Sequence, residues 1–365
     1  MIFSKLFLTI SKEGFKAVLI KIFRRLHYYL LRNLSYNQED KKSWEKLKAK
    51  YKGKRVFLIG NGPSLNKLPL YLLKNEYTMA FNRFYIMEER LNWIPNFFTT
   101  VDNLVLEDLC NDVEKITSKV DYAFFPKIHF RGTNFSKKIP NKPNILWLRQ
   151  KFGKNFSKVL PDVYQGGSVI IEGLQILNYL GFDKIYLIGV DMNFQLHTTT
   201  KSLNNYSAEI ISLNDDDPNH FDPRYFGKNR KYHQPEDYII KNIMNSLNYI
   251  GGNLDRFGLN IINAGVDSKV EAFPKENFIE ILNISPEEQK RLFTDLLKKT
   301  LILNDVKESI DDIMEVSDAE IVLDDLKTFI APMSIAISII QKLIFTHIPL
   351  GPYDNKFYFI KRKTL

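Results

Sequence analysis

The sequence predicts a doubly wound α/β fold with a mostly parallel sheet of the Rossmann-like type. Short, continuously apolar runs recur along the chain, as is typical of strands buried on both faces of a parallel sheet. Helical patterns separate several of these runs, and this alternation builds parallel sheets. Several runs end in glycine, asparagine or aspartate, where ligands bind such sheets. The runs are VFLIG, TMAF, FFTTV, YAFFP, NILWL, KIYLIGV and LNIINAG.

Composition describes an ordinary folded protein with an excess of positive charge. Of the 365 residues, 44% are hydrophobic and 25% charged, and the net charge of +9 suits an anionic partner. Nucleic acid, an anionic membrane and a nucleotide all meet that description, but no nucleic-acid-binding module is recognisable, so we expect no nucleic-acid partner. The lone Cys110 excludes an intramolecular disulfide and a cysteine-based zinc site, and it fits a reducing cytoplasm.

Residues 1–35 predict an amphipathic helix rather than a signal peptide, because lysines interrupt every apolar run. A basic amphipathic helix suits the surface of an anionic membrane, so we expect peripheral association with the inner face of the cytoplasmic membrane. The alternative is packing on the domain or on another subunit of a homo-oligomer. The predicted apolar face holds Phe7, Ile10, Phe15, Val18, Ile22 and Leu26, and the polar positions include Lys12, Lys16, Arg24 and Arg25.

The rest of the chain divides into a catalytic α/β domain over 52–285 and a helical C-terminal region over 286–365. Within the domain, 168–180 and 235–257 predict helices, and 196–236 predicts a lid segment. The C-terminal region opens with Ser285 as N-cap and Pro286 at the first helical position. The apolar stretch 329–351 falls short of a membrane span, and a dimer contact, a core helix and an interfacial segment stay open for it.

The loop GNGPSL follows the first predicted strand and contains Gly60, Asn61, Gly62 and Ser64. Glycines let the backbone approach a ligand closely, and a following helix would point free amides at an anion. The loop is not a dinucleotide fingerprint, because Leu65 stands where the third glycine belongs, and it lacks the Gly-Lys-Ser/Thr of a P-loop. A tight strand-to-helix turn explains the spacing equally well.

Other strand ends favour a pocket over a simple turn. Small or polar residues close the later strands or begin the helix after them, and carboxyl ends of parallel strands meet at one edge. We therefore expect a pocket rich in backbone amides there. Its further candidates are Asn82, Asp102, Asn103, Gly167, Ser168, Gly189 and Asp191.

The ordered motifs GNGPSL, FNRFY, GGSV, LGFDKIYLIGVD and NAGVDSKVEAFP resemble the bacterial lipooligosaccharide sialyltransferases that use CMP-sialic acid. They are also similar to the related superfamily of motility accessory factors and pterin-diphosphokinase-like (MptE-like) proteins. The resemblance covers about residues 52–278 and implies a Rossmann-like, GT-A-like variant fold. It implies that Asn61 and Asn82 bind the cytidine nucleotide and that Asp102 or Asn103 contacts the donor. The remaining roles fall on Gly167, Ser168, Gly189 and Ser268.

The sequence departs from this family at two places. Gln165 and Gly166 stand where the family has an arginine, and Asn193 replaces a tyrosine that steadies the leaving phosphate. That tyrosine role would move to Tyr225 or Tyr232, and the donor sugar stays open. The resemblance implies a histidine as general base, for which His233 is the first choice and His220 the second. The remaining histidines, His27, His129, His197 and His347, are expected to be structural or exposed.

The resemblance implies an inverting transfer of a 2-keto sugar acid, sialic acid-like or Kdo, from a CMP-activated donor to a surface glycan or glycolipid. No Asp-x-Asp motif follows a strand, and residues 214–219 predict a solvated acidic turn, so we expect no metal and no cofactor. Two alternatives stay open: a metal-dependent diphosphokinase, and a non-catalytic, membrane-associated nucleotide-binding subunit.

Overall fold

The computed structural model describes residues 15–129, 132–153, 155–203, 209–234, 236–305, 310 and 328–363. At its centre is an eight-stranded sheet in the order β11-β7-β1-β2-β3-β4-β5-β6, with every neighbouring pair parallel. This confirms the doubly wound α/β fold, and all seven predicted runs contribute a strand. The strands are β1 Arg55–Ile59, β2 Tyr77–Phe81, β3 Phe97–Thr99, β4 Tyr122–Pro126, β5 Ile145–Lys151, β6 Asp162–Tyr164, β7 Lys184–Ile188 and β11 Ile261–Asn263.

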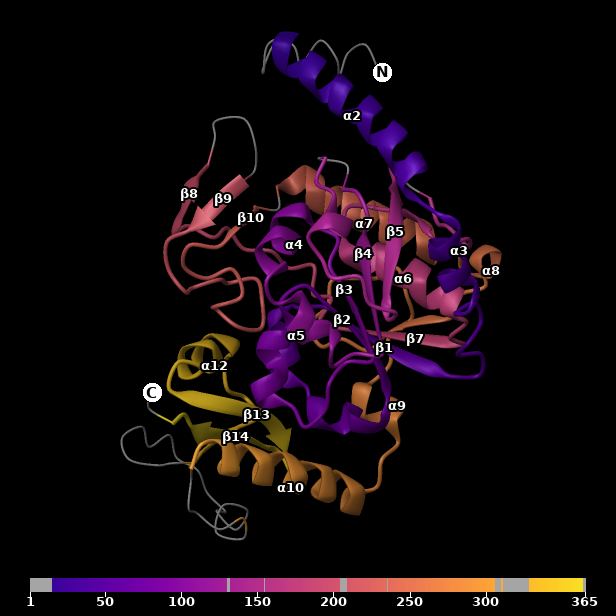
Figure 1. The fold of residues 1–365 in the computed structure, drawn as a ribbon. Coiled ribbons are helices and arrows are strands. Elements are labelled where there is room, and N and C mark those ends of the chain that lie inside the picture. The colour runs from indigo at the N-terminus through magenta and orange to yellow at the C-terminus, as the bar shows by residue number, and fades with distance from the viewer. Residues whose placement is uncertain are drawn as a thin grey trace.

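Helices cover both faces of this sheet (Figure 1). Val56 and Leu58 of β1 pack into one apolar cluster, whereas Phe57 and Ile59 pack into another. The first face carries α3 Gln38–Glu45, α6 Val169–Leu180, α7 Asp237–Gly251 and α8 Leu254–Phe257. The second carries α4 Asn103–Leu109, α5 Val113–Thr117, α9 Phe278–Leu282, α10 Pro286–Leu303 and the 3-10 helices η1 Pro63–Lys67, η2 Leu70–Asn75, η3 Phe84–Arg90 and η4 Phe135–Lys137. Two-sided burial explains why the strands lack polar alternation.

The strand order reverses next to β1. From β1 the chain builds outward through β2 to β6, then returns so that β7 and β11 lie on the other side of β1. The connection that follows β1 runs through η1 and η2 on the second face, whereas the connection from β7 to β11 returns through α7 and α8 on the first face. This is the topological switch point, where doubly wound sheets bind ligands.

The predicted helices form, with two adjustments. The Ser168 side chain caps α6, and the Ser285 side chain caps α10 by accepting from the Glu288 amide at 3.2 Å. The helix expected over 235–257 breaks after Gly251 into α7 and α8. The loop GNGPSL leads into the short η1 rather than into a full α-helix.

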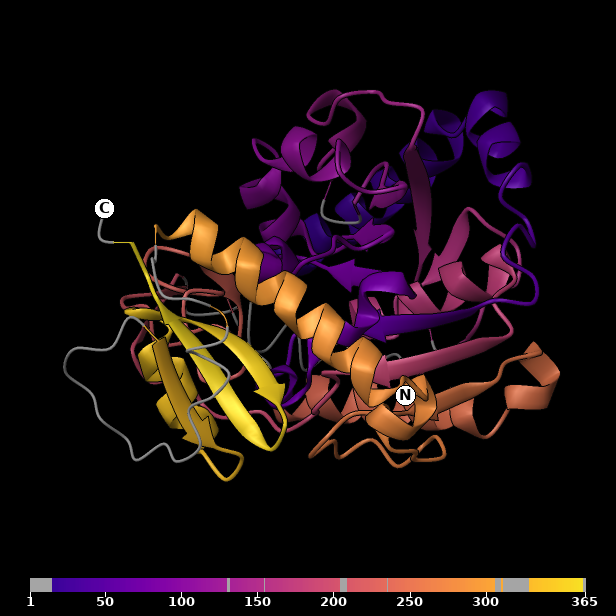
Figure 2. The same cartoon turned by 90° about the horizontal axis from the view of Figure 1, so that it is seen from below.

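The prediction of a helical C-terminal region is wrong in part. After α10 comes a three-stranded antiparallel sheet, β12-β14-β13, which packs beside α10 (Figure 2). Its strands are β12 Thr328–Pro332, β13 His347–Tyr353 and β14 Lys356–Lys361, with α12 Ile337–Leu343 between the first two. Asp354 and Asn355, both with positive φ, form the tight turn between β13 and β14. Two adjacent residues of this kind are typical of a β-hairpin, but no strand was predicted in the apolar stretch before them. Most of the predicted helical region between α10 and β12, residues 306–309 and 311–327, lies outside the described residues.

Two predicted appendages take defined shapes. The N-terminal helix is α2, Phe15–Ser35, which projects from the body (Figure 1), and residues 1–14 lie outside the described part. The predicted lid, 196–236, contains an antiparallel sheet of β8 Thr200–Ser202, β9 Glu209–Ser212 and β10 Lys231–His233, in the order β10-β9-β8. Among the described residues, no helix combines the length and apolarity needed to cross a bilayer.

Candidate active site

Two loops meet at the switch point, one after β1 and one after β7. The Gly60 amide donates to the Ile188 carbonyl, and the Gly62 amide to the Gly189 carbonyl, both at 2.8 Å. A Cβ atom added at Gly60 would lie 2.7 Å from the carbonyl carbon of Gly189. One added at Gly62 would lie 2.7 Å from Oδ1 of Asp191. Glycine is therefore needed at Gly60 because the two loops are in backbone contact there, and at Gly62 because the Asp191 side chain packs against it.

Three predicted ligand-binding residues fasten the loops after β1, β7 and β11 to one another. Asp191 accepts hydrogen bonds from the Ser64 amide, at 2.9 Å, and from the Ser64 hydroxyl. The Ser268 hydroxyl donates to the Val190 carbonyl at 2.6 Å. Burial raises the pKa of the Asp191 carboxyl, and the bonds from Ser64 offset part of that rise. The Ser64 amide thus faces a carboxylate of the chain itself, where we expected a ligand anion.

A row of carboxamides lies at the carboxyl ends of β1, β2 and β3. Asn61, Asn82 and Asn103 each carry a buried side-chain oxygen that has no hydrogen-bond partner among the described residues, as does the Thr100 hydroxyl. The Asn61 amide group reaches the Phe81 carbonyl at 3.4 Å, which links the ends of β1 and β2. Neighbouring strands lie about 4.8 Å apart. Because nearly all buried polar atoms in proteins are bonded, this row indicates a ligand site.

His233, at the end of β10, joins this row through Asp102. Its Nδ1 lies 3.2 Å from Oδ2 of Asp102, whose Oδ1 accepts from the Leu104 and Val105 amides to cap α4. Burial alone would raise the pKa of the Asp102 carboxyl, but hydrogen bonds from His233 and Val105 outweigh it, and the pKa is lowered. The Asp102 carboxylate therefore stays charged and holds the His233 imidazole at the start of α4, whose first residue is Asn103.

The other ring nitrogen of His233 faces Glu209 of the lid sheet. Nε2 is buried, has no hydrogen-bond partner among the described residues, and lies 3.6 Å from Oε1 of Glu209 on β9. The imidazole is thus flanked by two carboxylates, one on each nitrogen. Sequence analysis missed Glu209, because the pairing of β9 with β10 that brings it beside His233 has no local signal.

The start of α6 reaches the same edge of the sheet. A Cβ added at Gly173 would lie 2.8 Å from the Phe81 ring, so α6 crosses the end of β2 in close contact. Ser168 lies five residues earlier, about 7 Å further along the helix axis toward the strand ends. Its side chain caps the Ile170 amide, and Gly166 and Gly167 precede it with positive φ. The structure thus places Ser168 and Gly167 at the edge that carries Asn82.

Tyr225 and His220 lie beside the site in the lid segment. The Phe221 amide donates to the Asn61 carbonyl at 2.9 Å, which ties the lid to the β1 loop. The ring of His220 stacks on the ring of Tyr225 with 3.9 Å between their centroids, and Nδ1 of His220 lies 2.7 Å from Oδ2 of Asp217. Burial raises the pKa of the Tyr225 phenol well above its usual range. The Asn82 side chain offsets part of this rise in pKa, so the phenol lies next to Asn82.

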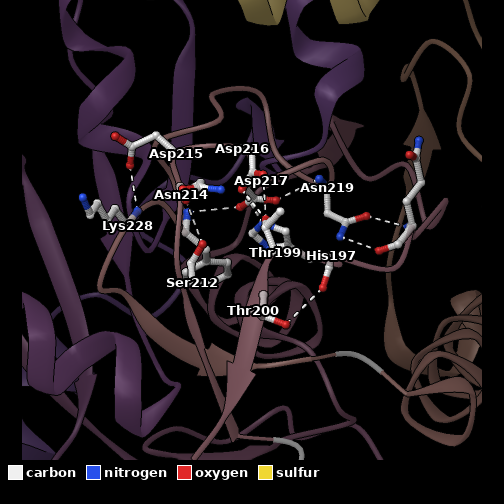
Figure 3. Close-up of polar contacts among 12 residues, drawn as sticks. His197, Thr199, Thr200, Ser212, Asn214, Asp215, Asp216, Asp217, Asn219 and Lys228 are labelled. Carbon is white, nitrogen blue, oxygen red and sulfur yellow. Dashed lines mark hydrogen bonds and ion pairs between the residues drawn. The ribbon is translucent and has the colours of Figure 1, made fainter.

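The remaining lid residues form an internal polar network (Figure 3). His197 bonds the Tyr232 hydroxyl through Nδ1 at 2.5 Å and Asp216 through Nε2 at 2.8 Å. Thr199 also donates to Asp216, and Asp217, 2% exposed, accepts from the Asn219 amide at 2.8 Å. The prediction of a solvated turn at 214–219 holds for the exposed residues 214–216 and is wrong for Asp217, whose buried carboxylate accepts hydrogen bonds from backbone amides of the lid. Tyr232 is engaged by His197, so its proposed phosphate role would require breaking that bond.

Hydrogen bonds and ion pairs link the C-terminal sheet and the segment after it to the rest of the domain and to the lid. The buried Arg90 bonds the Asn66 side chain and the Pro349 carbonyl. Arg224 of the lid and Arg362 from the C-terminal segment both pair with Glu89. These ion pairs connect three segments that are distant in sequence.

Two further observations bear on what the molecule binds. A cavity of about 360 Å³ lies between η1, α9 and the β13–β14 turn, lined by Lys67, Tyr71, Phe278 and Tyr353 among others, away from the asparagine row. Within the described ranges, no group of three or more His, Cys, Asp or Glu side chains is arranged to hold a metal ion.

Fold and candidate site together define a class: a doubly wound α/β protein with a candidate ligand site at its switch point. Residues 28–196 match the family model described as 6-hydroxymethylpterin diphosphokinase MptE-like. This match confirms the predicted resemblance to the MptE-like superfamily over those residues. It does not extend to the sialyltransferases.

The chain is also similar to a solved structure titled MAf glycosyltransferase from Magnetospirillum magneticum AMB-1. The identity is 14% and the TM-score 0.39, over 74% of this chain and 44% of that chain. This chain thus spans less than half of that protein. Among curated proteins, none matches.

Proposed function

We propose that the chain is an inverting glycosyltransferase that moves a 2-keto sugar acid from a CMP-activated donor to a bacterial surface glycan. The observation that carries the proposal is the row of unpartnered carboxamides beside a carboxylate-held histidine. The motifs that resemble the CMP-dependent sialyltransferases support the nucleotide, and they leave the choice between a sialic acid-like sugar and Kdo open.

The row of carboxamides suits a nucleoside. Unpartnered oxygens on Asn61, Asn82 and Asn103 require hydrogen-bond donors, which ribose hydroxyls and the exocyclic amine of cytosine supply. The amides at the start of α6, behind Ser168, suit the single phosphate of CMP. Asp191 already satisfies Ser64, so we assign Ser64 a structural part in this mechanism.

His233 is proposed as the general base. In the tautomer whose Nδ1–H donates to Asp102, Nε2 carries the lone pair that accepts a proton, and this atom has no hydrogen-bond partner among the described residues. Nε2 takes the proton of an acceptor hydroxyl while that oxygen attacks the anomeric carbon. The bond from that carbon to the phosphate oxygen breaks, and its electron pair leaves with CMP. Glu209 then stabilises the imidazolium that forms beside it.

A second candidate is a metal-dependent phosphotransferase, which the description of the matching family favours. Such an enzyme would bind ATP with Mg²⁺ and would not discriminate for CMP. A non-catalytic nucleotide-binding subunit is the third reading, under which His233→Ala would leave function intact.

Isothermal titration with CMP, CDP, UDP and ATP, each with and without Mg²⁺, separates these candidates. We expect CMP to bind in the micromolar range without Mg²⁺. Preference for ATP with Mg²⁺ would overturn the proposal in favour of the phosphotransferase. Transfer from CMP-sialic acid or CMP-Kdo, assayed with wild type and His233→Ala, then tests the base, because CMP binding without His233-dependent turnover indicates the non-catalytic subunit.

A further inference from the structure

Helix α2 exposes a stripe of large apolar side chains that the proposed chemistry does not use. At 100° per residue, these side chains fall within an arc of about 120° on one side of the helix. Their exposed fractions run from 45% to 81%, far above those of core residues. The stripe consists of Phe15, Leu19, Ile22, Phe23, Leu26, Leu30 and Leu34.

The C-terminal half of α2 is fixed firmly to the body of the protein. The Tyr28 hydroxyl donates to the Gln150 carbonyl at 2.6 Å, and Arg32 donates to the same carbonyl at 2.9 Å. Tyr28 is 1% exposed and packs edge-on against Phe152. From this attachment the helix projects outward (Figure 1), so the apolar stripe is held away from the core rather than folded onto it.

Charge decides between the partners that such a stripe could take. The α2 sequence contains five cationic residues, Lys16, Lys21, Arg24, Arg25 and Arg32, and no acidic residue. Pairing with a second copy of α2 would bring like charges together. An anionic lipid surface instead accepts the apolar stripe among its acyl chains and attracts the cations, at about 1 kcal/mol for each lysine or arginine near the surface.

We propose that α2 is a membrane-surface anchor that lies in the interface of an anionic bilayer with the stripe Phe15–Leu34 facing the lipid. The docking itself is independent of the proposed reaction. Its orientation has a consequence that rests on the proposed function. Gln150 lies near the carboxyl end of β5, and its side chain donates to Glu172 in the first turn of α6. The anchor is thus attached at the strand-end edge that carries the active site, which would face a lipid-linked acceptor.

Co-sedimentation of the full chain with vesicles tests the anchor. We expect the protein to sediment with phosphatidylcholine vesicles that contain added phosphatidylglycerol, more weakly with pure phosphatidylcholine, and less as salt rises. The double variant Phe23→Glu/Leu26→Glu should lower partitioning at least about tenfold, because two stripe residues become anionic. Val159→Glu is the matched control: Val159 is 71% exposed but lies outside α2, and its variant should bind as wild type does.

Circular dichroism and light scattering complete the test. Because Phe23 and Leu26 are exposed, the double variant should keep the wild-type melting temperature and, if the proposed function is right, CMP binding. Equal vesicle binding by wild type and double variant, or no binding by wild type, would overturn the anchor even if CMP still binds. A dimer mass that the double variant loses, without vesicle binding, would assign the stripe to self-association and likewise overturn it.

Discussion

Gly60→Ala is expected to destabilise the protein by separating the two switch-point loops. The new Cβ would lie 2.7 Å from the carbonyl carbon of Gly189, about 1 Å inside ordinary van der Waals separation. The obstructing atoms are backbone, so no side-chain rotation relieves the overlap. Overpacking of this kind costs about 1–3 kcal/mol. For a chain of 365 residues, with an unfolding entropy of about 2.1 cal/mol/K per residue, that lowers the melting temperature by roughly 1–4 °C.

Gly62→Ala is expected to behave differently because its obstacle is a side chain. Its Cβ would lie 2.7 Å from Oδ1 of Asp191, and Asp191→Ala removes that atom. Asp191→Ala alone should cost about 1.5–3 kcal/mol, since the bonds from Ser64 are lost. The Gly62→Ala/Asp191→Ala double variant should therefore be destabilised by less than the sum of the single changes, by about 1 kcal/mol or more.

Urea unfolding of the single and double variants measures both effects, with a second double variant, Gly60→Ala/Asp191→Ala, expected to be additive. Gly252→Ala is the control, because its φ is −74° and its added Cβ would meet its nearest neighbour at 3.4 Å. That change should stay within about 0.5 kcal/mol of wild type. The reasoning fails if Gly60→Ala proves as neutral as Gly252→Ala, or if Asp191→Ala rescues both glycine variants equally.

Three further predictions concern the site and its supports. Asn103→Leu should raise the melting temperature of the ligand-free protein, since it removes a buried polar group that has no hydrogen-bond partner among the described residues. The same change should weaken CMP binding at least about tenfold. A lower melting temperature would show that Asn103 has a structural role. Asp102→Asn should cut turnover by roughly 10²–10⁴-fold with CMP affinity little changed, because the His233 tautomer that carries its lone pair on Nε2 is no longer favoured. Unchanged turnover would exclude His233 as the base. Burial raises the pKa of Glu172 from 4.5 to about 8, so the stability of the wild type falls as pH rises between those values. Glu172→Gln should therefore flatten the pH dependence of stability. Urea midpoints that fall with pH equally in the variant would contradict this.

Local sequence signals were enough for most of the domain. The apolar runs predicted seven of the eight strands, because burial on both faces leaves an unbroken hydrophobic signal. Strand β6 was not predicted because it is three residues long and begins with the polar Asp162. The prediction of a helical region over 286–365 failed in part because composition alone does not separate short buried strands from buried helix. Pro332 and the Asp354–Asn355 turn were the signals against it.

For the site, the sequence by itself determined which residues stand at the strand ends, because each parallel strand delivers its next residue to the same edge. Asn61, Asn82, Asn103 and Ser168 follow from that rule. Only the tertiary structure decided that Asp191 accepts hydrogen bonds from Ser64. It also decided that Asp102 bonds Nδ1 of His233 and that Glu209 faces Nε2 of the same ring. Those pairs join residues about 24 to 131 positions apart. Contacts across such separations depend on how the loops and lid pack, and local propensity and hydrophobic periodicity carry no record of them.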